Sequence, residues 1–596
     1  MTRHLRNRGG TAIVAAVTLA ALVLTASPAA AGPSGAAGHR PDPTDPTRAA
    51  AGAARARAQA EDPDERTHTV PNELLKEELA EENEGAEGPE PTQSALCQQF
   101  IGRPNPYRNP APNVDAIVGD TIVQAGSQLG CSAAQNETTI AVNPYNPRNI
   151  VAGSNDYRVF NARENRNDSS GWAYTSFDGG ATWLNQALPH LTHQTGATGV
   201  LDYMDSAGDP AISFGPGNTV YYANLVFSRV VPADGSQQAS GLTVSVSHDG
   251  GRTWGEPSIL VLDGVTAAGT PTPTNFFNDK EWIAADPRTG TVYVTWTKFT
   301  YDADGNYLES PIVVKKSTDF GRTWSETRRV APSLTGFTGG ITPYDQGSNP
   351  QVGRDGTLYV AYEATVCETV ACDAADDHDA VVVATSRDGG RTFRNEEVAL
   401  DFDFPATLTG ENFRLNSYPL MSYDWLTDRL WITWADDRNG RYDEDGNSVK
   451  TNGDVFVVGS RKGSSGWSRP LKVGTPTDEF FPAVASFAGR VAVSYYTRKF
   501  DPTGVGVDYA YSIGWGTGVG GAPLRRITTQ TSDPQIQFLG FDEEGNEVQG
   551  VFIGDYTDMD IGVDLKIHPS WTDFRGRPGT TAPNQDVYTQ SISALH

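Results

Sequence analysis

The sequence predicts an all-β fold in which a four-stranded unit is repeated around an axis, a β-propeller. Three observations predict it. A turn motif returns four times at nearly constant intervals, short strands rich in Val, Ile, Tyr and Trp recur between the copies, and Gly, Pro, Asp and Asn separate these strands. The repeat favours seven units, with six as the alternative.

The turn motif, called the box below, has the pattern Ser-x-Asp-x-Gly-x-x-Trp/Phe, and its copies begin 71, 70 and 69 residues apart. The aspartate can accept hydrogen bonds from turn amides, the glycine supplies a positive φ, and the aromatic ring can fold back over the hairpin. We therefore interpret these residues as structural rather than catalytic: Asp178 with Trp183, Asp249 with Trp254, Asp319 with Trp324, and Asp388 with Phe393.

The repeated strands between the boxes extend the count. Seven units are expected to begin near residues 137, 209, 279, 347, 417, 479 and 553, and two of the later ones carry degenerate boxes at residues 460–467 and 512–515. The last unit lacks one strand, which we expect residues 116–125 to supply as its outer strand. Such a strand would close the ring.

The N-terminus precedes the repeats and has a different composition. Residues 1–31 combine three arginines, an apolar run and a small-residue cleavage site, which predicts a signal peptide rather than an uncleaved membrane anchor. Residues 32–95, rich in Ala, Pro and Glu, are expected to form a disordered linker, and residues 96–596 the propeller. We therefore expect a secreted, extracellular protein.

The charge limits the class of partner. Cleavage after Ala31 would change the formal charge of −27 to −30, because three arginines leave with the peptide. Such a chain repels nucleic acid and anionic membranes. We expect a monomer whose partner is an extracellular glycan or glycoprotein, with no nucleic acid and no membrane insertion after cleavage.

Four cysteines remain in the mature chain, which makes two disulfides plausible in an oxidising compartment. Cys367 and Cys372 are close enough in sequence to close one loop, and Cys97 with Cys131 would form the other. Their spacing matches no zinc pattern. We expect no cofactor and no metal site.

The boxes resemble those of the bacterial neuraminidase (sialidase) repeat family, over roughly residues 135–595. The stretches 136–144, 279–283 and 552–556 also resemble secreted bacterial proteins of the sialidase-like kind. The boxes are specific for the fold, and less so for activity, since such motifs also occur in propellers that are not sialidases.

Propeller geometry places the candidate site. First strands start, and second strands end, on the face opposite the boxes. This rim carries many polar residues: Glu137, Asp209, Asp279, Glu281, Asn349, Tyr418, Glu479, Asp555 and Tyr556 at the starts, and Asp156, Arg158, Arg229, Lys298, Glu363, Asp436, Arg438, Arg498, Asp573 and Arg575 among the ends.

The resemblance suggests roles for some of these residues. Sialidases hold a substrate carboxylate with three arginines, for which the candidates here are Arg158, Arg438, Arg498 and Arg575. They use a tyrosine nucleophile helped by a carboxylate, and an aspartate as acid/base. The matching candidates are Tyr556, then Glu363, then Asp156 or Asp279.

Two functions follow from these residues, and both stay open. The first is an exo-sialidase-type glycoside hydrolase acting on extracellular glycans. The second is a non-catalytic propeller that binds glycan or protein. In the second case the arginines form salt bridges with neighbouring aspartates, and Tyr556 is a packed core residue.

Overall fold

The computed structural model describes residues 113–117 and 134–595, apart from gaps at 162, 164–165, 231, 233–235, 304, 332–340, 368–376, 403–407, 409–412, 414, 417, 437–440, 443–447, 451–452, 535–538, 542–546, 550–551 and 576–584. The expected signal peptide and linker lie outside these residues. So do Cys97, Cys131 and Cys372, which include at least one partner of each expected disulfide.

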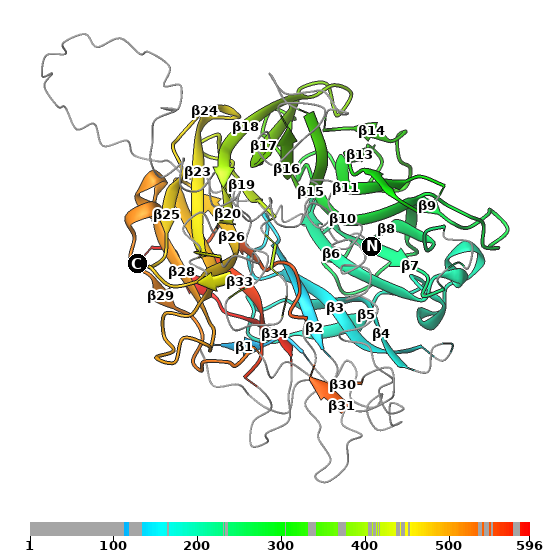
Figure 1. Cartoon of the computed structure of the whole chain (residues 1–596), viewed down its shortest axis with the longest axis horizontal. Coiled ribbons are helices and arrows are strands. Elements are labelled where there is room, and N and C mark those ends of the chain that lie inside the picture. The colour runs from blue at the N-terminus through cyan, green and yellow to red at the C-terminus, as the bar shows by residue number, and fades with distance from the viewer. Residues whose placement is uncertain are drawn as a thin grey trace, which may run out of the picture. The chain divides into compact units, whose positions relative to one another are not determined.

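The described chain is all-β, and seven four-stranded sheets form a propeller ring, as the sequence predicts (Figure 1). Each sheet, or blade, runs from an inner to an outer strand. Blades 1 to 3 contain β2 (Gln135–Val142), β3 (Ile150–Asn161), β4 (Arg166–Ser176) and β5 (Leu184–Ala187); β6 (Ser206–Phe214), β7 (Val220–Phe227), β8 (Ser240–Ser247) and β9 (Ser258–Asp263); and β10 (Phe276–Ala285), β11 (Val292–Tyr301), β13 (Ile312–Ser317) and β14 (Arg328–Arg329), with β12 (Tyr307–Glu309) beside β11.

The remaining blades follow the same order. They contain β15 (Ile341–Val352), β16 (Leu358–Cys367), β17 (Asp377–Ser386) and β18 (Arg394–Phe402); β19 (Leu420–Asp424), β20 (Arg429–Asp436), β23 (Asp454–Lys462) and the short β24 (Ser465–Trp467) and β25 (Leu471–Val473); β26 (Glu479–Phe487), β27 (Arg490–Thr497), β28 (Asp508–Trp515) and β29 (Arg525–Arg526); and β32 (Asp558–Ile561), β33 (Lys566–Asp573) and β34 (Asp586–Thr589).

The elements outside this pattern are short. They are the 3₁₀ helices η1 (His193–Thr195), η2 (Gly199–Tyr203) and η3 (Gly516–Gly521), the pair β21 (Arg441–Tyr442) and β22 (Ser448–Lys450), the pair β30 (Leu539–Phe541) and β31 (Glu547–Gln549), and β35 (Ile592–Ser593) beside β33. None of the helices in the described part of the chain is long and apolar enough to cross a membrane.

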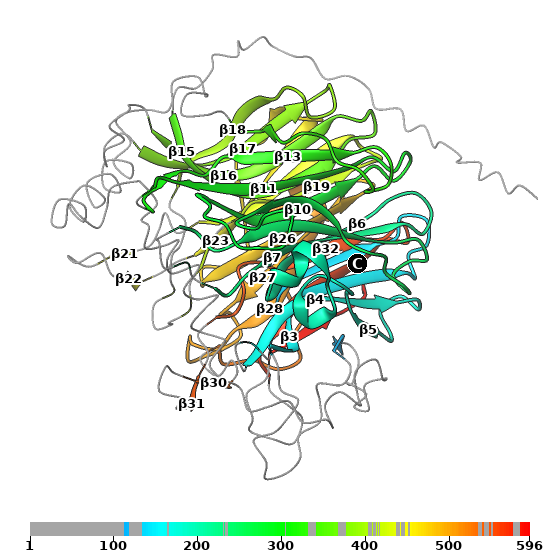
Figure 2. The same cartoon turned by 90° about the vertical axis from the view of Figure 1, so that its right-hand side faces the viewer.

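The blades are held together by apolar side chains on both faces of each sheet. In β7, Val220 and Tyr222 pack with Val151 of blade 1, whereas Tyr221 and Ala223 belong to the core shared with blade 3. Because side chains alternate along a strand, one apolar run serves both neighbours. Figure 2 shows these sheets stacked side by side.

The ring closes through a composite seventh blade. Its outer strand is β1 (Val114–Asp115), whose residues pair with Thr589 and Tyr588 of β34. The described outer strand therefore takes the role expected of residues 116–125 but lies just before that range, and residues 118–125 lie outside the described residues. The Ala116 amide adds a hydrogen bond of 2.9 Å to the Val587 carbonyl. Closure by the far end of the chain removes the open edge that a sheet otherwise exposes.

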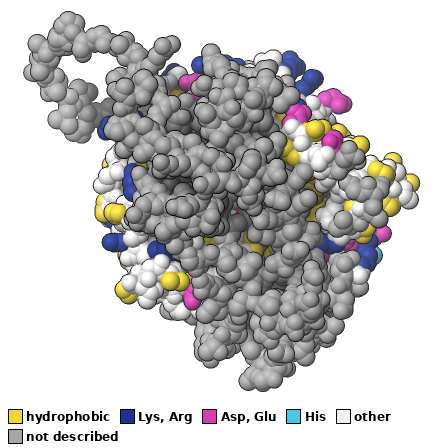
Figure 3. Space-filling model, viewed as in Figure 1, with side chains coloured by type: hydrophobic (Ala, Val, Ile, Leu, Met, Phe, Trp, Pro, Cys, Tyr) yellow, Lys and Arg dark blue, Asp and Glu magenta, His cyan; other side chains and the backbone are white. Residues whose placement is uncertain are grey.

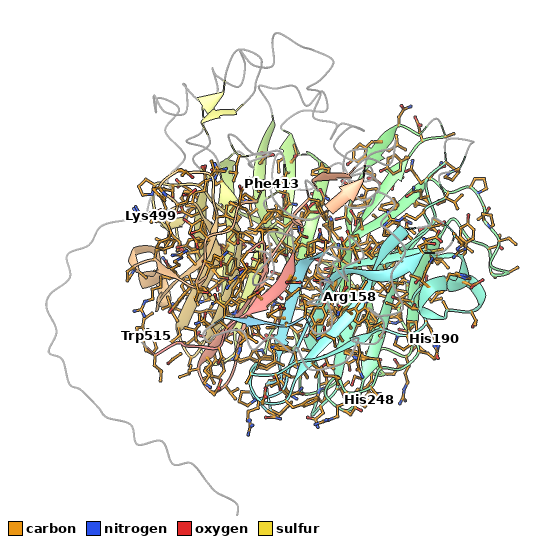
Figure 4. The ribbon with its side chains drawn as sticks, turned by 90° about the horizontal axis from the view of Figure 1, so that it is seen from below. Arg158, His190, His248, Phe413, Lys499 and Trp515 are labelled. Atoms are coloured by element: carbon orange, nitrogen blue, oxygen red, sulfur yellow. The ribbon has the colours of Figure 1, made fainter. Side chains whose placement is uncertain are left out.

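The boxes and the loops between first and second strands occupy one face of the ring, called the box face below. The amide of Gly250, in the second box, donates to Asn218 in the β6–β7 loop, and the Asn149 side chain of the β2–β3 loop donates to the Gly250 carbonyl. In Figure 4, His248 of this box and Trp515 lie toward one edge of the drawing, whereas Phe413 and Lys499 lie toward the opposite one.

The box aspartates hold their own turns. Asp249 Oδ1 accepts hydrogen bonds of 2.9 Å from the amides of Arg252 and Thr253, and Oδ2 accepts one of 2.7 Å from the Thr253 hydroxyl. Asp178 and Asp388 make the same contacts in their boxes. These bonds hold the pKa values of Asp319 and Asp178 below the usual range.

Candidate functional site

The inner strands carry a recurrent irregularity near their starts. The pairing of the first and second strands shifts register at this point in β2, β6, β10, β15 and β26. The residues at the shift include Glu137, Asp209 and Lys280, with φ of 53°, 50° and 50°. A bulge of this kind turns a side chain out of the regular alternation, and here it brings charged side chains of neighbouring blades together.

The result is a buried ion cluster centred on Lys280. Its Nζ lies 2.7 Å from Asp555 Oδ2, 3.3 Å from Asp209 Oδ2 and 3.7 Å from Glu137 Oε1. Lys280 is only 4% exposed, and the three carboxylates are buried too. They come from blades 1, 2 and 7, so one ammonium from blade 3 joins four blades at the axis.

Hydrogen bonds fix the Glu137 carboxylate and the backbone of Asp209 and Asp555. The Asn155 side chain donates to Glu137 Oε2 at 2.9 Å, and its own oxygen accepts the Asp209 amide at 2.7 Å. The Asp555 amide donates to Glu137 Oε1. Gly554, at φ 87°, precedes it, and a Cβ there would lie 2.6 Å from the Glu137 amide nitrogen. Only glycine fits so close an approach.

The electrostatics of the cluster follow from burial and like charge. Burial and the neighbouring Asp209 raise the pKa of Glu137 well above its usual range. Burial lowers the pKa of Lys280, but Asp209, Asp555 and Glu137 outweigh it, and the pKa stands well above the ordinary lysine value. Lys280 is therefore a permanent cation that neutralises part of a strongly acidic centre.

Tyr556 lies against this cluster. Its hydroxyl donates to the Pro210 carbonyl at 3.4 Å, and its ring meets Trp282 edge-on at 5.3 Å. Burial, then Glu137 and Asp209, raise the pKa of the Tyr556 phenol well above its usual value. A void of about 10 Å³ borders Tyr556, Lys280 and Glu281. This volume has room for about one water molecule and none for a sugar.

Glu281 borders the same void as Lys280 and Tyr556, at the end of the central channel of the propeller where the inner strands start. It is 1% exposed, and neither carboxylate oxygen accepts a hydrogen bond from another described residue. Burial, reinforced by Asp209, raises the pKa of Glu281 well above its usual range. A carboxyl group in such surroundings is neutral over a wide pH range.

The other carboxylates suggested by the resemblance lie in blade interiors or beside the cluster. Asp156 is buried in blade 1 and accepts hydrogen bonds from Arg158 and the Tyr174 hydroxyl. Asp279 precedes Lys280 and accepts its amide at 2.8 Å. Glu363 is buried on β16, opposite Gln346. Of the four candidate catalytic residues, the structure thus brings Asp279 and Tyr556 to the cluster.

The candidate substrate-binding arginines belong to separate ion pairs. Arg158 pairs with Asp156 at 2.6 Å and lies over the Trp172 ring, and its place in blade 1 is marked in Figure 4. Arg498 pairs with Asp478 at 3.0 Å in blade 6. In blade 7, Arg575 pairs with Asp573 at 2.7 Å and also bonds Asn113 and Thr529. Arg438 lies outside the described residues.

A wide cavity lies at the other end of the central channel, toward the box face, and is called the box-face cavity below. Its volume is about 450 Å³. Aromatic rings of five blades line it, along with the ends of the inner strands: Tyr145, Phe214, Trp282, Tyr423, Trp425 and Phe487.

Two carboxylates of β32 also line this cavity. Asp558 Oδ2 accepts hydrogen bonds from the Ile140 amide at 3.0 Å and the Thr139 hydroxyl at 3.1 Å. Asp560 Oδ2 accepts the Val142 amide at 2.8 Å. These bonds join blade 7 to blade 1. Burial raises the pKa of Asp558 to about 7 and that of Asp560 to about 6.

Lys280, Asp558 and Asp560 were not predicted as site residues from the sequence. A signal for the last two exists in the alternation Asp558-Met559-Asp560 on a first strand, since the other first strands are mostly apolar there. Lys280 stood between two acidic residues that were both chosen as rim candidates. The β-bulge in β10 is what places the Lys280 side chain beside the carboxylates of the neighbouring blades.

The visible margin of one face of the described structure is mixed in charge. Figure 3 shows Lys and Arg side chains together with Asp and Glu around the edge of one face of the described structure. A strong overall negative charge thus coexists with local basic regions.

No family model matches this chain, and no curated protein sequence does. Among solved structures, the chain is similar to the Hadza microbial sialidase Hz136, at 12% identity and a TM-score of 0.38 over 75% of this chain and 73% of that one. It is similar to the NanB sialidase of Streptococcus pneumoniae (10%, 0.37, covering 76% and 83%) and to an α-L-arabinanase of Penicillium chrysogenum (13%, 0.29, covering 50% and 90%). These neighbours are sialidases and an arabinanase, and at such identities and TM-scores they carry no argument about the activity of this chain.

Proposed function

We propose that this protein is a glycan-binding β-propeller that holds its sugar ligand in the box-face cavity. The observation that carries the proposal is the difference in cavity volume between the two ends of the central channel. The box-face cavity has about 450 Å³, within the range of small-ligand sites, whereas the void beside Tyr556 has about 10 Å³.

The lining of the cavity suits a sugar. A pyranose presents C–H groups on its faces and hydroxyls around its edge. The rings of Trp282 and Trp425 offer apolar surfaces for the faces, and Asp558, Asp560 and Gln351 offer oxygen and nitrogen atoms for the hydroxyls. Rigid inner strands carry most of these groups, which limits the entropy lost on binding.

Trp425 is positioned before any ligand arrives. Its ring meets Tyr423 edge-on at 5.7 Å, and the Arg288 guanidinium lies 5.0 Å from its centroid. Arg288 is in turn held by Asp286 at 3.0 Å. The tryptophan is thus held from two sides at the wall of the cavity.

A sialidase-type glycoside hydrolase is the second candidate, and one observation favours it. Tyr556 lies beside Glu137 and Asp209, the pairing of phenol and carboxylate that such a nucleophile needs. The burial of all three residues and the separate ion pairs of Arg158, Arg498 and Arg575 oppose it.

We also propose, from the N-terminal sequence alone, that the protein acts outside the cell.

Binding is tested by titrating the purified mature chain with a panel of neutral and acidic oligosaccharides in a calorimeter. We expect at least one to bind, and Trp425→Ala to weaken it about tenfold, which corresponds to about 1.4 kcal/mol. Leu426→Ala, next to it but outside the cavity lining, is the matched control. The proposal would be wrong if no oligosaccharide of the panel bound, or if Trp425→Ala bound with the affinity of the wild-type chain.

The hydrolase candidate is tested with a fluorogenic sialoside. Glycan binding without hydrolysis predicts no release of fluorophore by the wild-type chain or by Tyr556→Phe. Release by the wild type that disappears in Tyr556→Phe, with an unchanged thermal midpoint, would establish the hydrolase instead.

A further inference from the structure

The degenerate boxes of blades 5 and 6 lie beside a second pocket on the box face, called the basic pocket below. Its volume is about 270 Å³. Four cationic side chains and a single carboxylate border it, over a floor that includes Trp431: Arg354, Arg429, Arg461 and Lys462, with Asp428. Such a concentration of positive charge is unexpected in a chain of formal charge −27.

The sequence of the blade 5 box explains the charge. Lys462 occupies the position of the box aspartate, as Asp249 does in the second box, and Arg461 precedes it. Asp249 is consumed by three hydrogen bonds to its own turn. The Lys462 side chain is instead 74% exposed. A residue that stabilises the turn in other blades has been exchanged for one that faces solvent.

The backbone of this turn remains anchored despite the exchange. The Gly463 amide donates to the Asp428 carbonyl at 2.8 Å, and the Thr385 hydroxyl of blade 4 donates to Ser464 at 2.8 Å. Ser460 Oγ accepts the Leu430 amide at 2.8 Å. The cationic side chains therefore extend from an ordered backbone. Less conformational entropy is lost when such a site binds a ligand than when a flexible loop does.

The charges of the pocket are only partly balanced within the protein. Asp428 accepts the Tyr423 hydroxyl at 2.7 Å and Arg354 Nη2 at 3.2 Å, and lies 4.0 Å from Lys462 Nζ. Arg429 and Arg461 form no ion pair within the described part of the chain. Two guanidinium groups are thus available for an external oxyanion, which they bind through paired N–H donors.

An exposed aromatic ring adjoins the pocket. Trp515 is 63% exposed, and the Arg490 guanidinium lies 4.6 Å from its ring centroid. Gly489 lines the pocket, and a Cβ there would lie 3.5 Å from the Trp515 ring. Cations beside an open indole suit a ligand that carries both an oxyanion and a ring with C–H faces.

We propose that the basic pocket binds the sulfate or carboxylate groups of an acidic polysaccharide, with a sugar ring against Trp515. This site goes beyond the proposed function, because it is distinct from the box-face cavity and does not depend on a sugar binding there. The loops 423–429 and 486–489 border both sites, so one long glycan could contact the two in turn.

The test is calorimetric titration of the mature chain with heparin, with polygalacturonate and with neutral dextran at two salt concentrations. We expect one or both acidic polymers to bind, more weakly at high salt, and dextran to leave the pocket empty. Binding of heparin alone assigns sulfate as the recognised group, and binding of polygalacturonate alone assigns carboxylate. The double variant Arg429→Ala/Arg461→Ala should lose about tenfold or more in affinity.

The matched control is Arg391→Ala, which removes one exposed positive charge from an intact box on the same face. It should retain the wild-type affinity, and all variants should keep the thermal midpoint. Failure of both acidic polymers to bind, or an equal loss in Arg391→Ala, overturns the proposal. Trp425→Ala should bind the acidic polymer normally, so failure here and failure of the box-face cavity are separate results.

Discussion

The two ends of the central channel are built by the same inner strands and yet have opposite properties. Near the strand starts, bulges bring Lys280, Asp209 and Glu137 into a buried cluster that leaves about 10 Å³ beside it. Toward the box face, regular strand ends present rings around about 450 Å³. The comparison shows that a concentration of charged residues at an axis can serve to join blades, while the wider cavity lies where the strand ends are mainly apolar.

The largest effect on stability is expected from Lys280→Met, which tests whether the ion cluster joins the blades. Removing the one cation leaves three buried carboxylates unbalanced, which costs about 3 to 5 kcal/mol in the free energy of unfolding. The loss should be smaller at pH 5 than at pH 8, because the raised pKa lets Glu137 take up a proton. Urea unfolding followed by tryptophan fluorescence measures both.

The control for this variant is Lys566→Met, which breaks a pair with Asp564 that is largely exposed. It should cost less than about 1 kcal/mol. Equal losses in the two variants would mean that the cluster at the axis contributes nothing special.

The next largest effect is expected in the pH dependence of the unfolding free energy, through Asp558 at the box-face cavity. The pKa of Asp558 is about 7 in the folded chain, above its value of about 3.8 when unfolded, so the folded state binds the proton more tightly. This contribution to stability is complete below pH 4 and is lost as the pH rises to 7. Asp558→Asn keeps an acceptor for the Ile140 amide and should remove a change of up to about 4 kcal/mol across that window. An unchanged pH profile of the unfolding free energy would contradict it.

A smaller effect is expected from Glu281→Gln. The buried carboxyl of Glu281 has a pKa well above its usual range, so ionising it costs stability as the pH rises. The neutral amide should raise the free energy of unfolding by about 1 to 2 kcal/mol at pH 8 and have little effect at pH 4. Destabilisation at pH 8 would show that the carboxylate has a partner that stabilises it.

The smallest change in stability is expected from Tyr145→Ala at the mouth of the cavity. Tyr145 is 58% exposed, and its hydroxyl donates to the Pro287 carbonyl of blade 3 at 2.7 Å. The free energy of unfolding should fall by less than about 1 kcal/mol. Sugar affinity should fall severalfold, whereas Tyr145→Phe, which keeps the ring, should bind nearly as well as the wild type. A large stability loss with normal binding would reverse the roles assigned to the two ends.

Much of the fold could be predicted because its signals are local. The boxes, the alternation in strands such as β7, and the missing strand of the last unit each depend on residues close together in the chain. The position of the closing strand was predicted only in outline. Val114 and Asp115 pair with β34 through contacts between residues more than 470 positions apart, which no local pattern defines.

For the ion cluster at the axis, the sequence predicted which kinds of residue lie on the rim but not which of them contact one another. Glu137, Asp209, Asp555 and Tyr556 were all expected on one rim, and the structure brings them to one cluster. The spacing of residues along a strand does not reveal whether a bulge turns a side chain toward the axis. For that reason Lys280 went unnoticed.

The seven repeats, the all-β class and the turn chemistry of the boxes could be read from the amino-acid order, because each depends on spacing and residue type over a few positions. The folded chain is needed to know which polar groups are buried, where free volume remains, and that Lys462 and Arg429 line one pocket. Burial and volume arise when seven sheets pack around one axis, and they depend on every blade at once.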